Sequence, residues 1–168
     1  MIKKILFSII VVAIASVNLY AQKEKMQSIL VYNFISKFVE WPAASRSGNF
    51  VIGIVGNSPI NEFLTEISNV KKVGDQDIVV KKFKTASDIT NCHVLIIPQS
   101  SAKEIENSVP KVGATLVISD FADGVAKGAA INFVEVNNEQ KFEVKAVNAS
   151  DKGLLISPIL EKLAIKKY

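Results

Sequence analysis

The chain has 168 residues, 49% of them hydrophobic, and its 20 basic and 16 acidic side chains give a formal net charge of +4. This length suits one domain with a sizeable core, and the scattered basic residues lack the clustered face that nucleic-acid binding requires. A single cysteine excludes an internal disulfide, so packing must stabilise the fold. One histidine and one cysteine are too few for a standard structural zinc site, and we predict neither a metal nor a cofactor.

The N-terminus has the pattern of an export signal. Residues 1–21 read MIKKILFSIIVVAIASVNLYA, which is a basic start, an apolar run and the small residue Ala21 at the expected cut. The apolar run is short for a membrane span, and an uncleaved anchor is the alternative interpretation. No cysteine follows the cut, so a lipoprotein anchor is not indicated. We predict a signal peptide over 1–21 and one α/β domain over 22–168.

The exported part begins with a predicted helix over 24–40. Apolar residues recur there at helical spacing, and Pro42 ends the pattern because the residue before proline avoids the helical region. FVIGIVG (50–56) follows as a predicted strand that is covered on both faces. The next predicted helix has Ser58 as its N-cap and Pro59 at its first position.

The middle of the chain alternates strands with helices. Strands are predicted over 77–83, 94–97 and 115–120. A short helix is predicted over 86–90 and a longer one over 101–109. This alternation predicts an α/β fold, a single domain whose mostly parallel sheet is flanked by helices on both faces.

The last part of the chain departs from this rhythm. AAINFVEV (129–136) and KFEVKAV (141–147) flank VNNEQ, and this arrangement predicts a C-terminal antiparallel hairpin. The apolar segment 154–165 fits a strand or a helix. We favour a helix from Pro158 with Ser157 as its cap.

The only cysteine, Cys92, stands next to the only histidine, His93, and this pairing suggests a nucleophile and its base. Neighbouring side chains of a strand point to opposite faces, so the two could not reach each other. We therefore predict a buried thiol that forms no intermolecular disulfide, and a histidine held by a local hydrogen bond. The motifs G-x-S-x-G, H-E-x-x-H and the P-loop are absent, so we do not expect an enzyme.

Short polar side chains follow three strands of the predicted sheet. Asn57 and Ser58 follow one strand, Gln99 and Ser100 follow another, and Asp120 follows a third. Open parallel sheets bind ligands beyond the carboxyl ends of their strands, so these five are the candidate ligand-binding residues, for an anionic metabolite. Helix capping selects the same residue types and is the alternative interpretation.

Trp41 stands just past the first predicted helix, in NFISKFVEWP. An exposed tryptophan could anchor a partner protein, because tryptophan is enriched in binding hot spots, and Trp41 is therefore the candidate partner-binding residue. A core position at the junction of helix and sheet is the commoner situation for this side chain.

Six segments, in their order along the chain, resemble the YfiR family of periplasmic regulators. They cover nearly all of the chain after the predicted signal peptide: VYNFISKFVEWP (31–42), VIGIVGNSP (51–59), CHVLIIP (92–98), TLVISDFADGVAKGAAINFV (115–134), KFEVKAVNAS (141–150) and GLLISPILEKLA (153–164). The resemblance implies a non-catalytic, often dimeric α/β domain in the periplasm. It also implies signal transduction by protein–protein interaction, in which the regulator binds and represses the periplasmic sensing part of a membrane diguanylate cyclase, such as YfiN. Such repression links envelope stress to cyclic-di-GMP signalling and biofilm formation.

The chain departs from the family pattern at three places. Members often hold the strand cysteine in a disulfide, whereas Cys92 has no partner within the chain, so homodimers are expected to be non-covalent. Gly128-Ala129 stands where the family usually has Gly-Gly, and 142–145 reads FEVK in place of FEIN. For so divergent a chain the regulated enzyme could also be a sensor histidine kinase. The alternative function is small-ligand binding by the strand-end loops.

Overall fold

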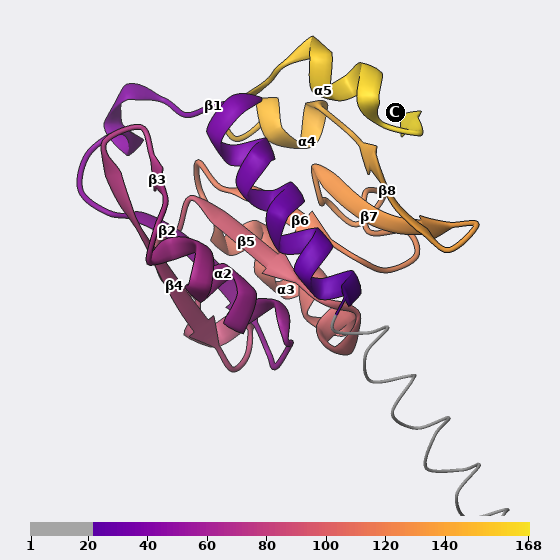
Figure 1. The fold of residues 1–168 in the computed structure, drawn as a ribbon, viewed down its shortest axis with the longest axis horizontal. Coiled ribbons are helices and arrows are strands. Elements are labelled where there is room, and N and C mark those ends of the chain that lie inside the picture. Colours follow the sequence, from indigo (N-terminus) through magenta and orange to yellow (C-terminus); the bar gives the residue numbers. More distant parts are fainter. Residues whose placement is uncertain (1–21) are drawn as a thin grey trace, which may run out of the picture.

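An N-terminal helix that includes residues 22–37 crosses one face of the central sheet in the computed structural model, which describes residues 22–168 (Figure 1). The helix ends three residues before the predicted limit of 40, because the chain turns at Phe38 into the short strand β1 (Val39–Glu40). The predicted signal peptide lies outside the described residues.

The central sheet has eight strands in the order β10-β8-β7-β6-β5-β2-β4-β3. The hairpin strand β8 runs antiparallel to β7, the edge strand β3 runs antiparallel to β4, and the other pairs are parallel. The prediction of an α/β domain with a mostly parallel sheet and a C-terminal antiparallel hairpin is confirmed. The strands are β2 (Phe50–Val55), β3 (Lys72–Val73), β4 (Gln76–Phe83), β5 (Val94–Ile97), β6 (Leu116–Ser119), β7 (Ile131–Val136), β8 (Glu139–Val144) and β10 (Lys166–Lys167).

The order of the parallel strands reverses between β2 and β5. The chain first makes β2, then places β4 on one side of it and β5, β6 and β7 on the other. In open parallel sheets such a point of reversal leaves a crevice outside the carboxyl ends of the two strands. The edge of the sheet beyond β2 and β5 is therefore the first place to look for a site.

Four further α-helices and four 3-10 helices connect the strands. They are α2 (Ile60–Ser68), α3 (Ile105–Ser108), α4 (Val147–Ser150), α5 (Pro158–Leu163), η1 (Ala43–Ser45), η2 (Ala86–Asp88), η3 (Gln99–Glu104) and η4 (Val109–Lys111). A separate two-stranded sheet pairs β1 with β9 (Leu155–Ile156) in antiparallel fashion.

The prediction of a single helix over 101–109 is wrong, because this segment is divided into η3, α3 and η4. Ser101 has a non-helical φ of −117°, and its buried side chain lies against Gly56. Gly56 has a φ of +78°, and a Cβ there would overlap Ser101 Oγ. This close approach of the loop after β5 to the loop after β2 interrupts the helix.

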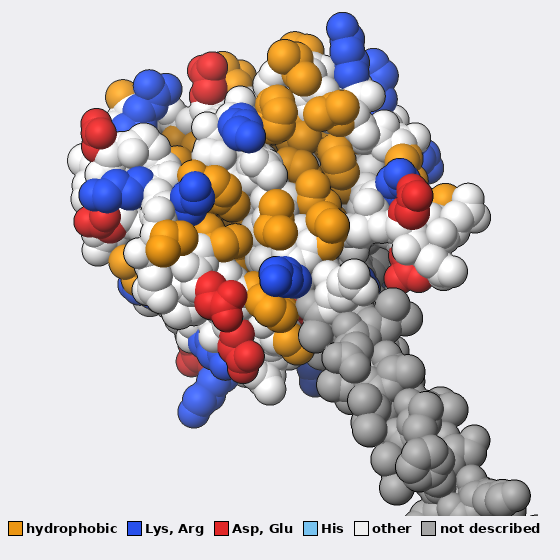
Figure 2. All heavy atoms as spheres, in the orientation of Figure 1, with side chains coloured by type: hydrophobic (Ala, Val, Ile, Leu, Met, Phe, Trp, Pro, Cys, Tyr) orange, Lys and Arg blue, Asp and Glu red, His pale blue; other side chains and the backbone are white. Residues whose placement is uncertain are grey.

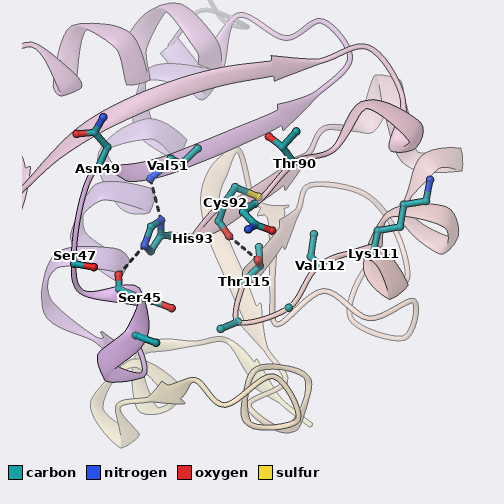
Figure 3. Close-up of a pocket in the computed structure, with 14 residues that line it drawn as sticks. Ser45, Ser47, Asn49, Val51, Thr90, Cys92, His93, Lys111, Val112 and Thr115 are labelled. Atoms are coloured by element: carbon teal, nitrogen blue, oxygen red, sulfur yellow. Dashed lines mark hydrogen bonds between the residues drawn. The ribbon is translucent and has the colours of Figure 1, made fainter.

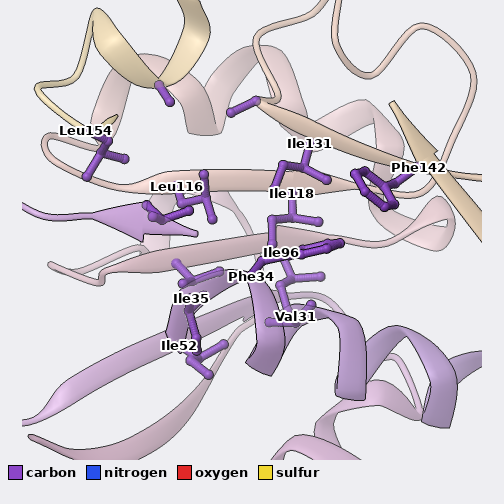
Figure 4. Close-up of a cluster of buried hydrophobic side chains, with 14 of the residues drawn as sticks. Val31, Phe34, Ile35, Ile52, Ile96, Leu116, Ile118, Ile131, Phe142 and Leu154 are labelled. Carbon is purple, nitrogen blue, oxygen red and sulfur yellow. The ribbon is translucent and has the colours of Figure 1, made fainter. Parts of the chain in front are cut away.

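Alternate strand residues divide the core into two layers. Ile52, Ile96 and Ile118 point toward the N-terminal helix, whose Phe34 and neighbours cover them (Figure 4). This layer also includes buried residues of α2, α4 and α5. The opposite face of the sheet packs against α3 and the loops around it; its buried residues include Val55, Leu95, Ile97, Val117, Ile105 and Phe121.

Local sequence chemistry accounts for the C-terminal elements. Asn137 and Asn138 have φ of 52° and 61°, the left-handed conformations that a two-residue hairpin turn requires. Ser157 Oγ accepts a hydrogen bond from the backbone N–H of Ile159 at 3.2 Å, and Pro158 occupies the first turn of α5. The hairpin and the capped C-terminal helix are confirmed.

Candidate functional site

The side chain of His93 connects its own strand to two other backbone segments at the amino-terminal edge of the sheet (Figure 3). Its Nδ1 accepts a hydrogen bond from the N–H of Val51 at 3.0 Å, so its proton is on Nε2, which donates to the carbonyl of Ser45 at 2.8 Å. The ring also stacks on Phe50, with centroids 4.5 Å apart. Both ring nitrogens make hydrogen bonds with backbone groups, so neither is free to act as a catalytic base.

Cys92 faces the other layer of the core. Its side chain is 7% exposed and packs among the buried residues on the α3 side of the sheet. Burial raises the pKa of the Cys92 thiol to about 11, although the hydroxyl of Thr115 partly opposes the shift. The buried position of Cys92 is confirmed, and its side chain and that of His93 lie in different layers, so the geometry of a catalytic dyad is missing.

Cys92 should therefore react slowly with iodoacetamide in the native protein. Raising the pKa of the thiol to about 11 lowers the thiolate fraction roughly a hundredfold, and thiolate is the reactive form. Timed labelling read by mass spectrometry measures the rate, and unfolding in urea should restore fast labelling. A cysteine introduced at the exposed residue Ser87 should label quickly in the same molecule. Equal labelling of both positions would contradict the burial argument.

A pocket of about 420 Å³ opens beside Cys92 and His93 (Figure 3). Its lining residues are mostly small or polar, and its one charged lining residue, Lys111, donates to the carbonyl of Ala86 at 3.2 Å. The sequence analysis missed this pocket, because it considered only the carboxyl ends of the parallel strands. The pocket lies at the opposite edge of the sheet, where these strands begin. Its polar lining residues include Ser45, Ser47, Asn49, Thr90, Asn91 and Thr115.

The five predicted ligand-binding residues lie together at the carboxyl-terminal edge of the sheet. Asn57 and Ser58 follow β2, Gln99 and Ser100 follow β5, and Asp120 follows β6. Ser100 Oγ donates to the carbonyl of Asn57 at 3.2 Å, so the loops after β2 and β5 are directly linked. Ser58 Oγ accepts from the N–H of Ile60 at 3.4 Å, which is the contact of a helix cap.

Two side chains of the N-terminal helix cover this edge. Lys23 Nζ lies 3.9 Å from Asp120 Oδ2, and Ser58 Oγ donates to Glu24 Oε2 at 3.5 Å. Burial raises the pKa of the Asp120 carboxyl, with Lys23 opposing the shift. Burial, and then the nearby Asp120, raise the pKa of Glu24. Side chains of the chain itself therefore occupy the space over the strand ends.

Trp41 is buried and is not exposed for a partner contact in this structure. Its side chain is 6% exposed, and its Nε1–H donates to the carbonyl of His93 at 3.4 Å. The indole meets the Phe50 ring edge-on, with centroids 5.0 Å apart. The indole therefore fills the junction between the helix and the sheet.

Exposed hydrophobic side chains gather over the N-terminal helix and the nearby C-terminal segments (Figure 2). The pairing of β1 with β9, and a 2.8 Å hydrogen bond from the N–H of Ser157 to the carbonyl of Phe38, place the start of α5 beside the end of the N-terminal helix. We call the exposed residues of these elements the apolar face: Met26, Ile29, Leu155, Ile159 and Leu163. Contiguous exposed apolar patches mark interaction sites.

The sequence carries a signal for this apolar face that sequence reasoning did not use. Ile159 and Leu163 are one helical turn apart, and only Leu160 between them is fully buried. A short surface helix needs only one apolar face to pack against the core. The second apolar face of α5 is therefore not explained by core packing.

The comparisons with known proteins agree with this picture. A family model described as YfiR/HmsC-like matches residues 24–165, and the chain therefore belongs to the YfiR/HmsC-like family. This is a family of periplasmic regulators of diguanylate cyclases, and it is regulatory rather than enzymatic. No curated protein matches the chain. Among residues 22–168, no helix has the length and apolar character needed to cross a bilayer, and no three metal-ligating side chains come together.

Proposed function

We propose that this protein binds the periplasmic part of a membrane-bound diguanylate cyclase through the apolar face and represses that enzyme. The observation that carries the proposal is the exposure of large apolar side chains on paired elements: Leu155, Ile159 and Leu163 are 59–62% exposed. Family membership supplies the class of partner. In this proposal the chain is itself no enzyme, and its signal peptide delivers it to the periplasm.

The apolar face has the energetic content that a regulatory complex needs. Covering one large aliphatic side chain contributes about 1.5–3 kcal/mol when it becomes fully buried. A few such residues at the centre of an interface can carry most of the binding energy, since hot spots dominate affinity. The face is held by β1–β9 pairing and by the capped start of α5, so little order has to be created on binding.

A sensor histidine kinase remains the second partner class of this proposal, because the same surface would serve either receptor. Small-ligand binding at Asn57, Ser58, Gln99, Ser100 and Asp120 has less support, because Lys23 and Glu24 occupy that edge.

Two acidic substitutions on the apolar face should abolish partner binding. We expect Ile159→Glu with Leu163→Glu to weaken binding at least about a hundredfold, since two hot-spot contacts are replaced by charges that must lose water. Both residues are exposed, so the fold should persist. Val70→Glu is the matched control, because Val70 is 76% exposed and lies just after α2. In cells, the double variant should raise cyclic-di-GMP while the control keeps it low.

The partner is identified by placing a photo-crosslinking amino acid at Ile159 and, as the control, at Val70. Capture of a membrane diguanylate cyclase from Ile159 alone supports the proposal, and capture of a sensor histidine kinase selects the second class. A double variant that still binds and represses like the wild type would disprove the role of the apolar face.

A further inference from the structure

The strand β4 has a free edge over most of its length. On one side β2 pairs with Ile78–Phe83, and on the other side the two-residue strand β3 pairs only with Gln76 and Asp77. Within the described part of the chain, residues 78–83 therefore have a neighbouring strand on one side only. This edge lies at the end of the sheet opposite to the hairpin of β7 and β8 (Figure 1).

One hydrogen bond to β2 shows which backbone groups of this edge are free. The N–H of Gly56 donates to the carbonyl of Phe83 at 2.7 Å, so the backbone groups of Phe83 are directed toward β2. This direction alternates along a strand, so every second residue before Phe83 also faces β2. The residues between them, Ile78, Val80 and Lys82, direct their N–H and C=O groups away from β2. Such a row of unpaired groups is a template for another strand.

The side chains along the free edge change from apolar to basic. Val79 and Val80 are partly buried, and the next two residues, Lys81 and Lys82, are exposed. Neither lysine forms a salt bridge with a carboxylate of residues 22–168. Lys82 Nζ donates to a neutral oxygen, Asn57 Oδ1, at 3.4 Å. The chain itself therefore leaves the positive charge at this end of the edge without a counter-charge.

These lysines disfavour one occupant of the edge, a second copy of the chain. Pairing two β4 edges would place Lys81 and Lys82 of both molecules along one short ladder, and like charges opposite each other destabilise a sheet. Lysines on edge strands protect proteins against such self-association. The same charges favour a strand of opposite charge, because specificity combines repulsion of one partner with attraction of another.

We propose that the free edge of β4 binds an extended acidic segment of another protein, which adds a strand to the sheet. The outward N–H and C=O groups of Ile78, Val80 and Lys82 pair with the backbone of this segment, as in other cases of strand addition. In the antiparallel arrangement, two acidic residues of the segment lie opposite Lys82 and Lys81. Two β-branched residues follow them and lie opposite Val80 and Val79.

The test uses the protein without its predicted signal peptide and the peptide TEEVVT, acetylated and amidated so that its ends carry no charge. NMR measures amide hydrogen exchange along β4 before and after millimolar peptide is added. In the free protein, the amides of Val80 and Lys82 should exchange at least about tenfold faster than those of Val79 and Lys81, which face β2. The peptide should slow the exchange of the first pair and leave the second pair unchanged.

Charge reversal tests the recognition of acidic residues. Lys81→Glu with Lys82→Glu should weaken the binding of TEEVVT at least about tenfold, because two attractive cross-strand charge pairs become repulsive. The same variant should bind the peptide TKKVVT more tightly than the wild type does. Lys103→Glu with Lys162→Glu is the matched control, because both lysines are exposed and the net charge changes by the same amount.

Two substitutions at Lys82 separate strand addition from simple charge attraction. Lys82→Pro removes an outward N–H as well as the charge, and proline is tolerated at such positions of edge strands, so the fold should persist while peptide binding is lost. Lys82→Ala removes only the charge and should keep part of the binding. Lys81→Pro removes an N–H that faces β2 and should lower the melting temperature.

Three results would each overturn the proposal. They are equal exchange rates along 78–83 in the free protein, no response of any β4 amide to millimolar TEEVVT, and equal binding of this peptide by the wild type and the charge-reversed variant. The lysines would then only protect the edge against self-association. Ile159→Glu with Leu163→Glu should bind the peptide like the wild type, so a failure at the β4 edge is distinct from a failure of partner binding at the apolar face.

Discussion

Phe34→Ala is expected to lower the free energy of unfolding by about 3–5 kcal/mol, the usual cost of truncating a buried phenylalanine. Phe34 is 2% exposed and lies between the N-terminal helix and the hairpin side of the sheet. Its ring centroid is 4.9 Å from that of Phe142 and 6.0 Å from that of Phe133, so the substitution opens a cavity and removes two aromatic contacts. Against a typical domain stability of about 5–15 kcal/mol, such a loss is severe.

Urea denaturation followed by circular dichroism measures this loss. Met26→Ala is the matched control, because it truncates a large side chain of the same helix that is 47% exposed, and its effect should stay within about 0.5 kcal/mol. A loss below about 1 kcal/mol for Phe34→Ala would mean that the N-terminal helix does not contribute to the main core as described.

Gly124→Ala should have the second large effect on stability, about 2–4 kcal/mol, from overpacking together with a broken buried hydrogen bond. A Cβ at Gly124 would overlap Ser119 Oγ and lie 2.8 Å from Asn132 Oδ1. These two atoms form a buried hydrogen bond of 2.7 Å, and the same Asn132 oxygen accepts from the N–H of Phe121 at 3.3 Å. The added methyl group would separate these partners and leave polar atoms unpaired.

Gly113→Ala is the control for this prediction, because no atom lies within 4 Å of a Cβ at Gly113 and its φ is not positive. It should leave the melting temperature unchanged or slightly higher, through the entropy of the unfolded chain. Gly124→Ala combined with Ser119→Ala should cost less than the sum of the two single changes, because the serine oxygen is the first atom that the methyl group meets. Strict additivity would contradict the steric explanation.

The sequence was informative where one pattern extends over several residues. The all-apolar strands, the Asn137-Asn138 turn and the Ser157-Pro158 start of α5 follow from period, turn chemistry and capping, and the structure contains each of them. The two-residue strands β1, β3, β9 and β10 were not predicted. Such strands depend on a partner far away in the sequence, and two residues carry no periodicity.

At the candidate site, too, features that depend on neighbouring residues were predicted, and contacts between residues far apart in the sequence were not. The strand-end residues Asn57, Ser100 and Asp120 were expected at one edge because parallel strands end together, and they lie there. What covers them could not be read from the sequence, since the covering residues Lys23 and Glu24 precede them by more than thirty positions. The apolar face likewise combines the first and the last helix of the described chain.

The meeting of the two ends of the described chain has a consequence for the order in which the protein folds. The N-terminal helix contributes Phe34 to the same buried cluster as Leu160 of α5, and β1 pairs with β9. Synthesis proceeds from the N-terminus, so the N-terminal helix cannot be covered completely until almost the last residues have emerged from the ribosome. Closing contacts over so long a stretch of chain is slow compared with local helix formation. Part of this helix in the nascent polypeptide therefore stays accessible to chaperones until synthesis is nearly complete.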